Sequence, residues 1–153
     1  MNQDTIIIRP LSDADLPRCA AFMAAQDPWK TLGIGADRCL SGISGAHLVR
    51  HGLYLDGGVV GLAVAHPTGF VSSPYLAVLA VAAAHTGCGF GSRLLEHVER
   101  EAFRDRRNLF LCVTSFNERA QRFYLARGYQ QIGVIKDFFK PGVDELIMRK
   151  VKT

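Results

Sequence analysis

The chain of 153 residues has little of what marks membrane, secreted or metal-binding proteins. Its longest apolar run, Tyr75 to Ala84, is too short to cross a bilayer, and its amino terminus lacks the basic segment of a signal peptide. The four cysteines form no Cys-x-x-Cys pair, so neither a metal site nor a disulfide framework is expected. Repeats, linkers and low-complexity segments are missing as well. These absences predict a single domain over residues 1–153, no metal, no membrane partner and a reducing cytoplasm.

The net charge of +4 is modest, and arginine supplies most of the positive groups, with 13 arginines against 5 lysines. Guanidinium groups suit bidentate contacts with phosphate. Arginines nevertheless alternate with Glu and Asp along the predicted helix from Phe90 to about Arg106, which is typical of a solvated helix face. No nucleic-acid partner is therefore expected.

The most informative segment joins an apolar strand to an amphipathic helix through a glycine-rich turn. The strand ends at Leu79-Ala80-Val81, and the turn reads Thr86-Gly87-Cys88-Gly89-Phe90-Gly91-Ser92. Alternate glycines allow the backbone to pass close to a ligand, where a Cβ would intrude. The helix then presents free N–H groups and a positive dipole end, which favour a phosphate. The segment predicts that a phosphorylated cofactor binds at residues 87–92.

Two motif families that use such a turn do not fit. A Walker-type loop ends in Gly-Lys-Ser/Thr, whereas Ser92 and Arg93 follow Gly91 here. A dinucleotide fingerprint needs a third glycine where this chain has Ser92, and an acidic residue at the end of the next strand. The predicted strand Leu109 to Val113 ends in Thr114-Ser115, without a carboxylate. An ATPase and a GTPase are therefore disfavoured, and a nucleotide-dependent oxidoreductase is the weaker alternative.

Residues 86–91 resemble the pyrophosphate loop of the GNAT superfamily of N-acetyltransferases, Gln/Arg-x-x-Gly-x-Gly/Ala, although Thr86 stands where Gln or Arg is usual. Residues 117–129 resemble the downstream motif of the superfamily, in which Asn-x-x-Ala-x-x-Phe-Tyr precedes a Gly-aromatic pair. Asn117 is also a good N-cap for the helix that follows. One face of that helix carries Ala120, Phe123, Tyr124 and Arg127. The two motifs stand in the order that the superfamily has.

The resemblance implies an α/β fold (α+β in some schemes) with a mixed, mostly antiparallel sheet of about six to seven strands and helices on both faces. The central strands that end near Val81 and Thr114 are expected to splay apart, so that the pantetheine arm of the cofactor enters the gap. Before them, Gly57-Gly58 predicts a hairpin, and Ser12 with Asp15 predicts a capping box for the first helix.

The resemblance also implies the chemistry, in which an amine attacks the thioester of acetyl-CoA directly. Leu79, Ala80 and Val81, residues 86–92 and Asn117 are then the residues that hold acetyl-CoA. A backbone N–H near Ala80 to Val81 is expected to stabilise the oxyanion. Tyr124 is expected to protonate the departing sulfur, because a phenol with a pKa of about 10 stays protonated at neutral pH.

The sequence does not single out the base that takes the proton of the acceptor ammonium. The strand from Tyr75 to Val81 carries no carboxylate, and Cys112 stands where the related branch that includes ribosomal-protein N-terminal acetyltransferases has a Glu. The remaining candidates are a water chain and five side chains, His47, His66, Asp27, Asp137 and Glu145.

The acceptor and the assembly also stay open. The segment from Asp27 to Gly45 is expected to shape the acceptor pocket, but it contains no acidic cluster and names no amine. A small-molecule amine and a peptide amine are both compatible with it. An acyl-CoA-binding sensor or interaction module without catalysis is the main alternative, and a homodimer stays open because dimers are common in this fold.

Overall fold

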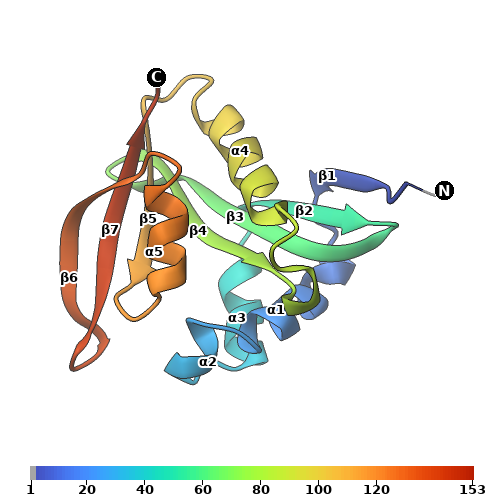
Figure 1. Ribbon diagram of the computed structural model, residues 1–153, viewed down its shortest axis with the longest axis horizontal. Coiled ribbons are helices and arrows are strands. Elements are labelled where there is room, and N and C mark those ends of the chain that lie inside the picture. The colour runs from blue at the N-terminus through green and yellow to red at the C-terminus, as the bar shows by residue number, and fades with distance from the viewer. Residues whose placement is uncertain (1–2) are drawn as a thin grey trace.

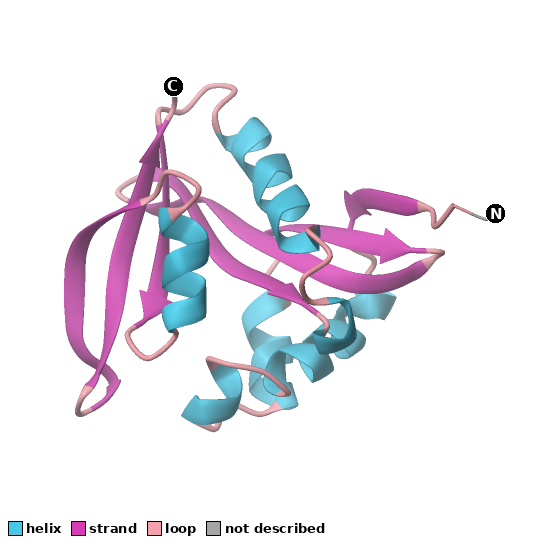
Figure 2. Ribbon diagram, viewed as in Figure 1, coloured by secondary structure: helices cyan, strands magenta, loops and turns pink. Residues whose placement is uncertain are grey.

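Seven strands build one mixed sheet with the order β1-β2-β3-β4-β5-β7-β6 (Figures 1 and 2). The computed structural model describes residues 3–153. The strands are β1 (Ile6–Pro10), β2 (Val49–Leu55), β3 (Gly58–Phe70), β4 (Ser73–Val81), β5 (Asn108–Thr114), β6 (Gln130–Lys140) and β7 (Val143–Val151). The helices are η1 (Asp13–Asp15), α1 (Leu16–Ala24), α2 (Trp29–Leu32), α3 (Ala36–Ile43), η2 (Ala83–His85), α4 (Phe90–Ala102) and α5 (Glu118–Leu125).

Helices cover both faces of the sheet, because alternate strand residues point to opposite sides. Leu53 packs in the core beneath α4 and α5, whereas its neighbour Tyr54 packs in a second core with α1 and α3. Figure 1 shows α1, α2 and α3 grouped on one side of the sheet and α4 and α5 on the other. This arrangement confirms the predicted fold class.

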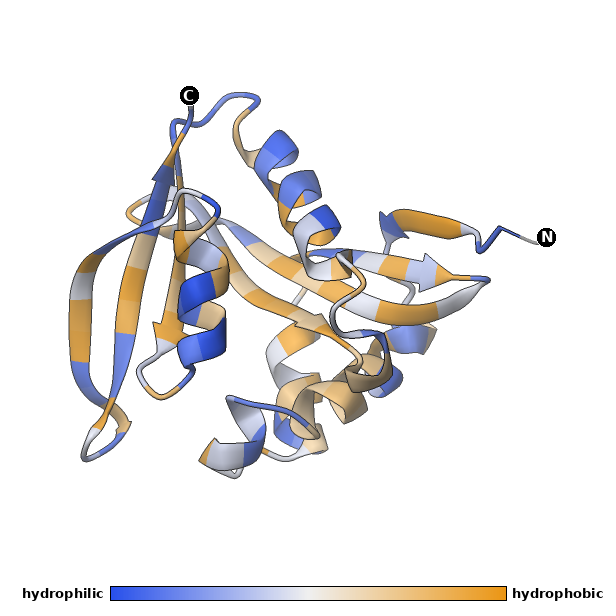
Figure 3. Cartoon of the chain, in the orientation of Figure 1, coloured by the Kyte–Doolittle hydropathy of each residue, from blue (hydrophilic) through white to orange (hydrophobic). Residues whose placement is uncertain are grey.

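Helix α4 is amphipathic, as its spacing predicts. Phe90, Leu94, Val98 and Ala102 recur at every fourth position and are all buried. Figure 3 shows hydrophilic residues along the outer side of α4 and hydrophobic ones on the strands beneath it. The helix ends at Ala102, one turn before the predicted end near Arg106.

The predicted hairpin forms between β2 and β3, whereas the predicted capping box of the first helix does not. The Ser12 side chain makes no capping hydrogen bond. The Asp15 carboxylate instead accepts a hydrogen bond of 2.9 Å from the hydroxyl of Tyr54 on β2. The capping-box prediction was wrong because a distant side chain competes for the carboxylate.

The centre of the sheet is splayed. Strands β4 and β5 run parallel and pair at only two positions, Tyr75 with Phe110 and Leu76 with Leu111. Beyond these pairs the carboxyl ends of the two strands diverge, as Figure 1 shows. The predicted splayed pair is therefore confirmed.

None of the helices within residues 3–153 combines the length and apolar character that crossing a membrane requires.

Candidate active site

The glycine-rich turn after β4 has two glycines in the left-handed region. Gly87 has φ +82° and Gly89 has φ +80°, and a Cβ added at either position has no neighbour within 4 Å. Backbone conformation, and not crowding, therefore requires glycine at these two positions. Gly91 differs, because it lies inside α4 and its added Cβ would be 3.6 Å from the ring of Phe123.

The start of α4 faces a cavity of about 640 Å³, here called the glycine-loop cavity. The first hydrogen bond of the helix runs from the Arg93 N–H to the Gly89 carbonyl, 3.1 Å. The amides at positions 90–92 have no carbonyl one turn earlier to bond, so they point out of the helix end. The loop residues that line the cavity are His85, Thr86, Gly87, Gly89, Phe90, Gly91 and Ser92. Cys88 is exposed and is not among them.

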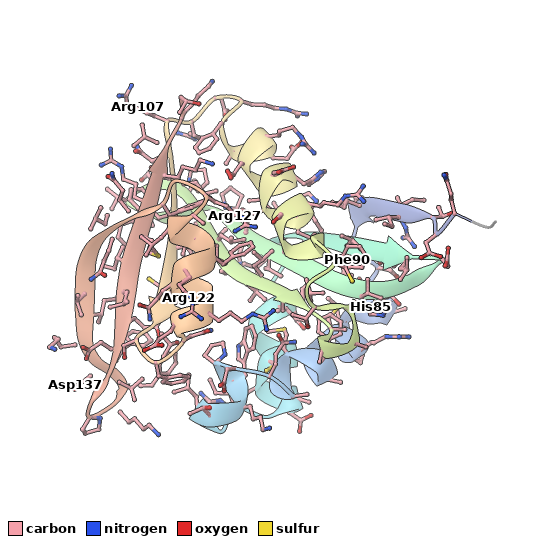
Figure 4. All side chains as sticks on the ribbon, viewed as in Figure 1. His85, Phe90, Arg107, Arg122, Arg127 and Asp137 are labelled. Atoms are coloured by element: carbon pink, nitrogen blue, oxygen red, sulfur yellow. The ribbon has the colours of Figure 1, made fainter. Side chains whose placement is uncertain are left out.

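Arg127 ties α5 to the beginning of α4. Its guanidinium donates hydrogen bonds to the Ser92 hydroxyl, 3.1 Å from Nε, and to the Phe123 carbonyl, 2.9 Å from Nη1. It also lies 3.7 Å from the centroid of the Phe123 ring. Figure 4 shows Arg127 between α5 and α4, on the same side as His85 and Phe90. A positive charge is thus fixed at the wall of the glycine-loop cavity.

The edge of β4 that does not pair with β3 faces the splayed gap between β4 and β5. The Ala82 N–H donates to the Val60 carbonyl on β3, 2.8 Å. Because amides alternate in direction along a strand, the Ala80 N–H also points to β3, and those of Leu79 and Val81 point into the gap. The Val81 carbonyl, on the same edge, accepts a hydrogen bond of 3.0 Å from the Gln26 side chain.

Asn117 lies between β5 and α5 and caps the helix. Its Oδ1 accepts a hydrogen bond of 3.2 Å from the Ala120 N–H. The amide nitrogen of the same side chain takes no part in this bond. Asn117 lines both the glycine-loop cavity and a second cavity beside it.

The second cavity, about 380 Å³, lies beside the first, shares Ala120 and Tyr124 of α5 with it, and is here called the Trp29 cavity. Its walls come from the segment around α2, from β4 and β5, and from the β6–β7 hairpin. Six aromatic side chains line it: Trp29, Phe70, Tyr75, Tyr124, Phe138 and Phe139.

Tyr124 belongs to the walls of both cavities. Its side chain packs edge-to-face against Phe123 and Tyr129, and the residue is only 8% exposed. Burial raises the pKa of the Tyr124 hydroxyl above its ordinary range, although the Arg127 charge opposes the shift. The phenol is therefore protonated across the neutral pH range.

The two cavities carry opposite charge. Arg119 and Arg127 line the glycine-loop cavity, with Asp27 as its acidic residue. In the part of the chain that the structure describes, no Lys, Arg or His lines the Trp29 cavity, whereas Asp27 and Glu145 do. The first cavity suits a phosphate group, and the second suits an ammonium group.

The structure separates the five candidate bases. The rings of His47 and His66 contact each other with centroids 4.8 Å apart and planes tilted by 57°, and neither residue lines either of the two cavities. Asp137 lies in the β6–β7 hairpin, away from the loop residues in Figure 4, and accepts a hydrogen bond of 2.7 Å from the Gly142 N–H. Asp27 and Glu145 both line the Trp29 cavity.

Glu145 differs from Asp27 in burial. Asp27 is exposed and accepts hydrogen bonds from the Thr31 amide and hydroxyl. Glu145 on β7 lies directly opposite Thr114 on β5, is 8% exposed, and accepts a hydrogen bond of 2.6 Å from the Thr114 hydroxyl. Burial raises the pKa of the Glu145 carboxyl, and the Thr114 bond partly opposes the shift.

Sequence reasoning missed two residues of the site. Gln26 carries no motif, because its contact with Val81 joins residues 55 positions apart. Arg127 shares the face of Phe123 and Tyr124 in the helical pattern, and that spacing was the signal for its place at the glycine-loop cavity.

Residues 15–129 match the model of the GNAT acetyltransferase family. Among solved structures, a GNAT-family acetyltransferase from Desulfovibrio desulfuricans has a TM-score of 0.77 and 20% identity, over 96% of this chain and 99% of that one. The ribosomal-protein-S18-alanine N-acetyltransferase from Escherichia coli has a TM-score of 0.75 and 22% identity, over 96% and 94%. An aminoglycoside 6'-N-acetyltransferase in complex with coenzyme A has a TM-score of 0.76 and 16% identity, over 95% and 96%. No curated protein matches the chain.

The fold and the family match define an acyltransferase. The chain belongs to the GNAT family of N-acetyltransferases.

The glycine loop gives a test that uses stability alone. Gly89→Ala places a Cβ on a left-handed residue, so we expect a loss of about 1–2 kcal/mol in the free energy of unfolding. Gly91→Ala is the control, because it adds a methyl group to a helical residue at an ordinary contact distance. Urea unfolding of both variants measures the difference, and an equal effect at the two positions would contradict the assigned backbone.

Glu145 gives a prediction for stability as a function of pH. Because the folded state raises the pKa of this carboxyl above the ordinary 4.5, the folded protein binds the proton more tightly than the unfolded chain does. Stability is therefore highest below the ordinary pKa and falls as the pH rises through the folded pKa. Glu145→Gln stays neutral and keeps the oxygen that accepts the Thr114 bond. We expect Tm of the variant minus Tm of the wild type to increase between about pH 4 and pH 8.

Asp144→Asn is the control, and its expected trend has the opposite sign. The Asp137 N–H and then the Lys136 side chain lower the pKa of the Asp144 carboxyl. This carboxylate stabilises the fold above its ordinary pKa and loses the effect as the pH falls. A Tm difference that does not change with pH for Glu145→Gln would contradict the raised pKa.

Proposed function

We propose that the chain transfers the acetyl group of acetyl-CoA to a primary amine, by direct attack of the amine on the thioester. The observation that carries this proposal is the position of Tyr124, a buried and protonated phenol in the wall between two cavities of opposite charge. An anionic cofactor on one side and a cationic acceptor on the other would meet at this side chain.

In the proposed complex, acetyl-CoA occupies the glycine-loop cavity. The amides at the start of α4, the Ser92 hydroxyl and the Arg127 guanidinium bind the pyrophosphate, in keeping with the affinity of helix N-termini for anions. The pantetheine arm lies along the open edge of β4, where the Val81 amide faces the gap. The side-chain nitrogen of Asn117, which its capping hydrogen bond does not use, donates a hydrogen bond to the cofactor.

The acetyl group then lies at the junction of the two cavities. Leu79 borders both of them and its N–H faces the gap, so we assign it as the donor that stabilises the oxyanion. The hydrogen bonds between β3 and β4 take up the Ala80 amide, so Leu79 and Val81 are the residues of this segment whose amides can bind the cofactor. Tyr124 protonates the sulfur as the C–S bond breaks.

The assay that tests the proposal is acetyl-CoA-dependent release of free thiol with a panel of amines. The panel contains peptide amino termini, peptide lysines, aralkylamines, polyamines, amino acids and aminoglycosides. Such a range is needed because two structures that share this fold are named for different acceptors, a ribosomal-protein alanine and an aminoglycoside. Silence with every amine, with acetyl-CoA binding measured by calorimetry, would favour an acyl-CoA-binding module without catalysis.

Tyr124→Phe tests the role of the phenol. We expect kcat to fall by roughly 10²–10⁴-fold with little change in the Kd for acetyl-CoA, because the hydroxyl acts on the leaving sulfur. Tyr129→Phe is the matched control, since its hydroxyl is buried beside Tyr124, makes no hydrogen bond within residues 3–153 and lines neither cavity. An unchanged kcat in Tyr124→Phe would remove this residue from the mechanism.

A further inference from the structure

Glu145 is a buried carboxyl group that faces a cavity without a positive partner. Its hydrogen-bond partner in the structure is the Thr114 hydroxyl, 2.6 Å away. Within residues 3–153, no Lys, Arg or His nitrogen forms an ion pair with it. Buried carboxylates are normally paired with a cation, because an isolated charge is costly to remove from water. A positive partner for the ionised form of Glu145 would therefore have to come from a ligand.

The rest of the Trp29 cavity indicates what carries that positive charge. Its walls are mostly apolar, and the hairpin residues Ile135, Phe138 and Phe139 are among the hydrophobic residues that line it. These three side chains are 37–55% exposed, so they are accessible to a ligand. A cavity with an apolar wall and one buried carboxylate suits a single ammonium group on an apolar body.

We propose that the acceptor is a primary amine carried on an apolar body, and that Glu145 binds its ammonium group and takes its proton. The proposal rests on the acetyltransferase function proposed above and names the acceptor class and the base of that reaction. Both a small aralkylamine and a peptide amino terminus with an apolar first side chain have this chemistry.

The ionisable neighbours of Glu145 leave it as the proton acceptor. Tyr75 on β4 and Cys112 on β5 lie beside it, and burial raises the pKa of each, so both stay neutral. Tyr124 faces the cavity from α5 and is also protonated. From β6, the residue paired with Glu145 is the apolar Ile135.

The ammonium gives one proton to the Glu145 carboxylate, which later releases it to solvent. The amine nitrogen then bonds to the carbonyl carbon, and the C–S bond breaks with its electron pair on sulfur. Sulfur takes the Tyr124 proton, and the nitrogen returns its second proton to the tyrosinate. The products are the amide, CoA thiol and one released proton.

The first experiment measures binding and needs no turnover. Trp29 is the single tryptophan of the chain and lines the cavity, so its fluorescence reports occupancy. The probes are 2-phenylethylamine and the neutral 2-phenylethanol, titrated at pH 8 into the protein saturated with CoA. We expect Glu145→Gln to weaken binding of the amine by about tenfold or more, the loss of one charge-assisted hydrogen bond, and binding of the alcohol by less than about twofold. Asp144→Asn, one residue away on the other face of β7, is expected to match the wild type.

Equal binding of the amine to wild type and Glu145→Gln would overturn the role of Glu145. Failure of both probes to bind would overturn the apolar acceptor class. Binding that depends on Glu145, together with no thiol release from any amine, would leave the ammonium site in place and overturn the transferase function. The two proposals therefore fail in distinguishable ways.

The second experiment measures the pH dependence of kcat/KM with amines that are acetylated. A base that must be ionised gives a rate that rises with pH through its pKa. We expect Glu145→Gln to lower kcat/KM by roughly 10²–10⁴-fold and to abolish the rise of kcat/KM with pH. If Glu145 were merely structural, the variant would keep the same pH dependence. Thr114→Val removes the hydrogen-bond donor that lowers the Glu145 pKa, so the rise of kcat/KM with pH should move to higher pH in this variant. Comparing 2-phenylethylamine with a peptide that begins with phenylalanine separates the two sources of the amine.

Discussion

The short pairing between β4 and β5 is the constraint on which the rest of the molecule depends. Two strands that pair at only two positions leave two open edges in the middle of a sheet. Buried backbone amides and carbonyls need partners, so such edges must be covered or satisfied. Helix α5 lies in front of the gap, and the Gln26 side chain satisfies the Val81 carbonyl. The remaining edge of β4 is a template on which an extended ligand can form a strand-like ladder.

The splay also explains why the site residues come from distant parts of the chain. The glycine loop follows one diverging strand and Asn117 follows the other, so the starts of α4 and α5 stand on either side of the gap. Arg127, just after the end of α5, donates a hydrogen bond to the Ser92 hydroxyl near the start of α4 and so links the two helices. A cavity with a positively charged wall results, although no single segment of the sequence is strongly basic.

Local patterns were sufficient for most of the fold. The glycine spacing, the fourfold repeat in α4 and the Asn117 cap depend on neighbours in sequence, and each was predicted. Contacts between residues far apart in the sequence could not be predicted from local patterns. The Ser12 capping box failed because Tyr54, far away in sequence, binds Asp15. For the same reason sequence alone could not choose among five bases: Glu145 differs from the others through its place on β7 opposite β5.

Burial raises the pKa of both acids of the site, Tyr124 and Glu145, but it suits the first to donate a proton and the second to accept one. It raises the pKa of Tyr124, which keeps an already weak acid protonated and able to donate to sulfur. It raises the pKa of Glu145 toward neutrality, which makes the carboxylate a stronger base while it can still ionise. A lysine or arginine in the Trp29 cavity would lower the pKa of Glu145 and repel an ammonium ligand. The lack of cationic side chains among its described lining residues is therefore a condition for the proposed chemistry, as much as the carboxylate itself.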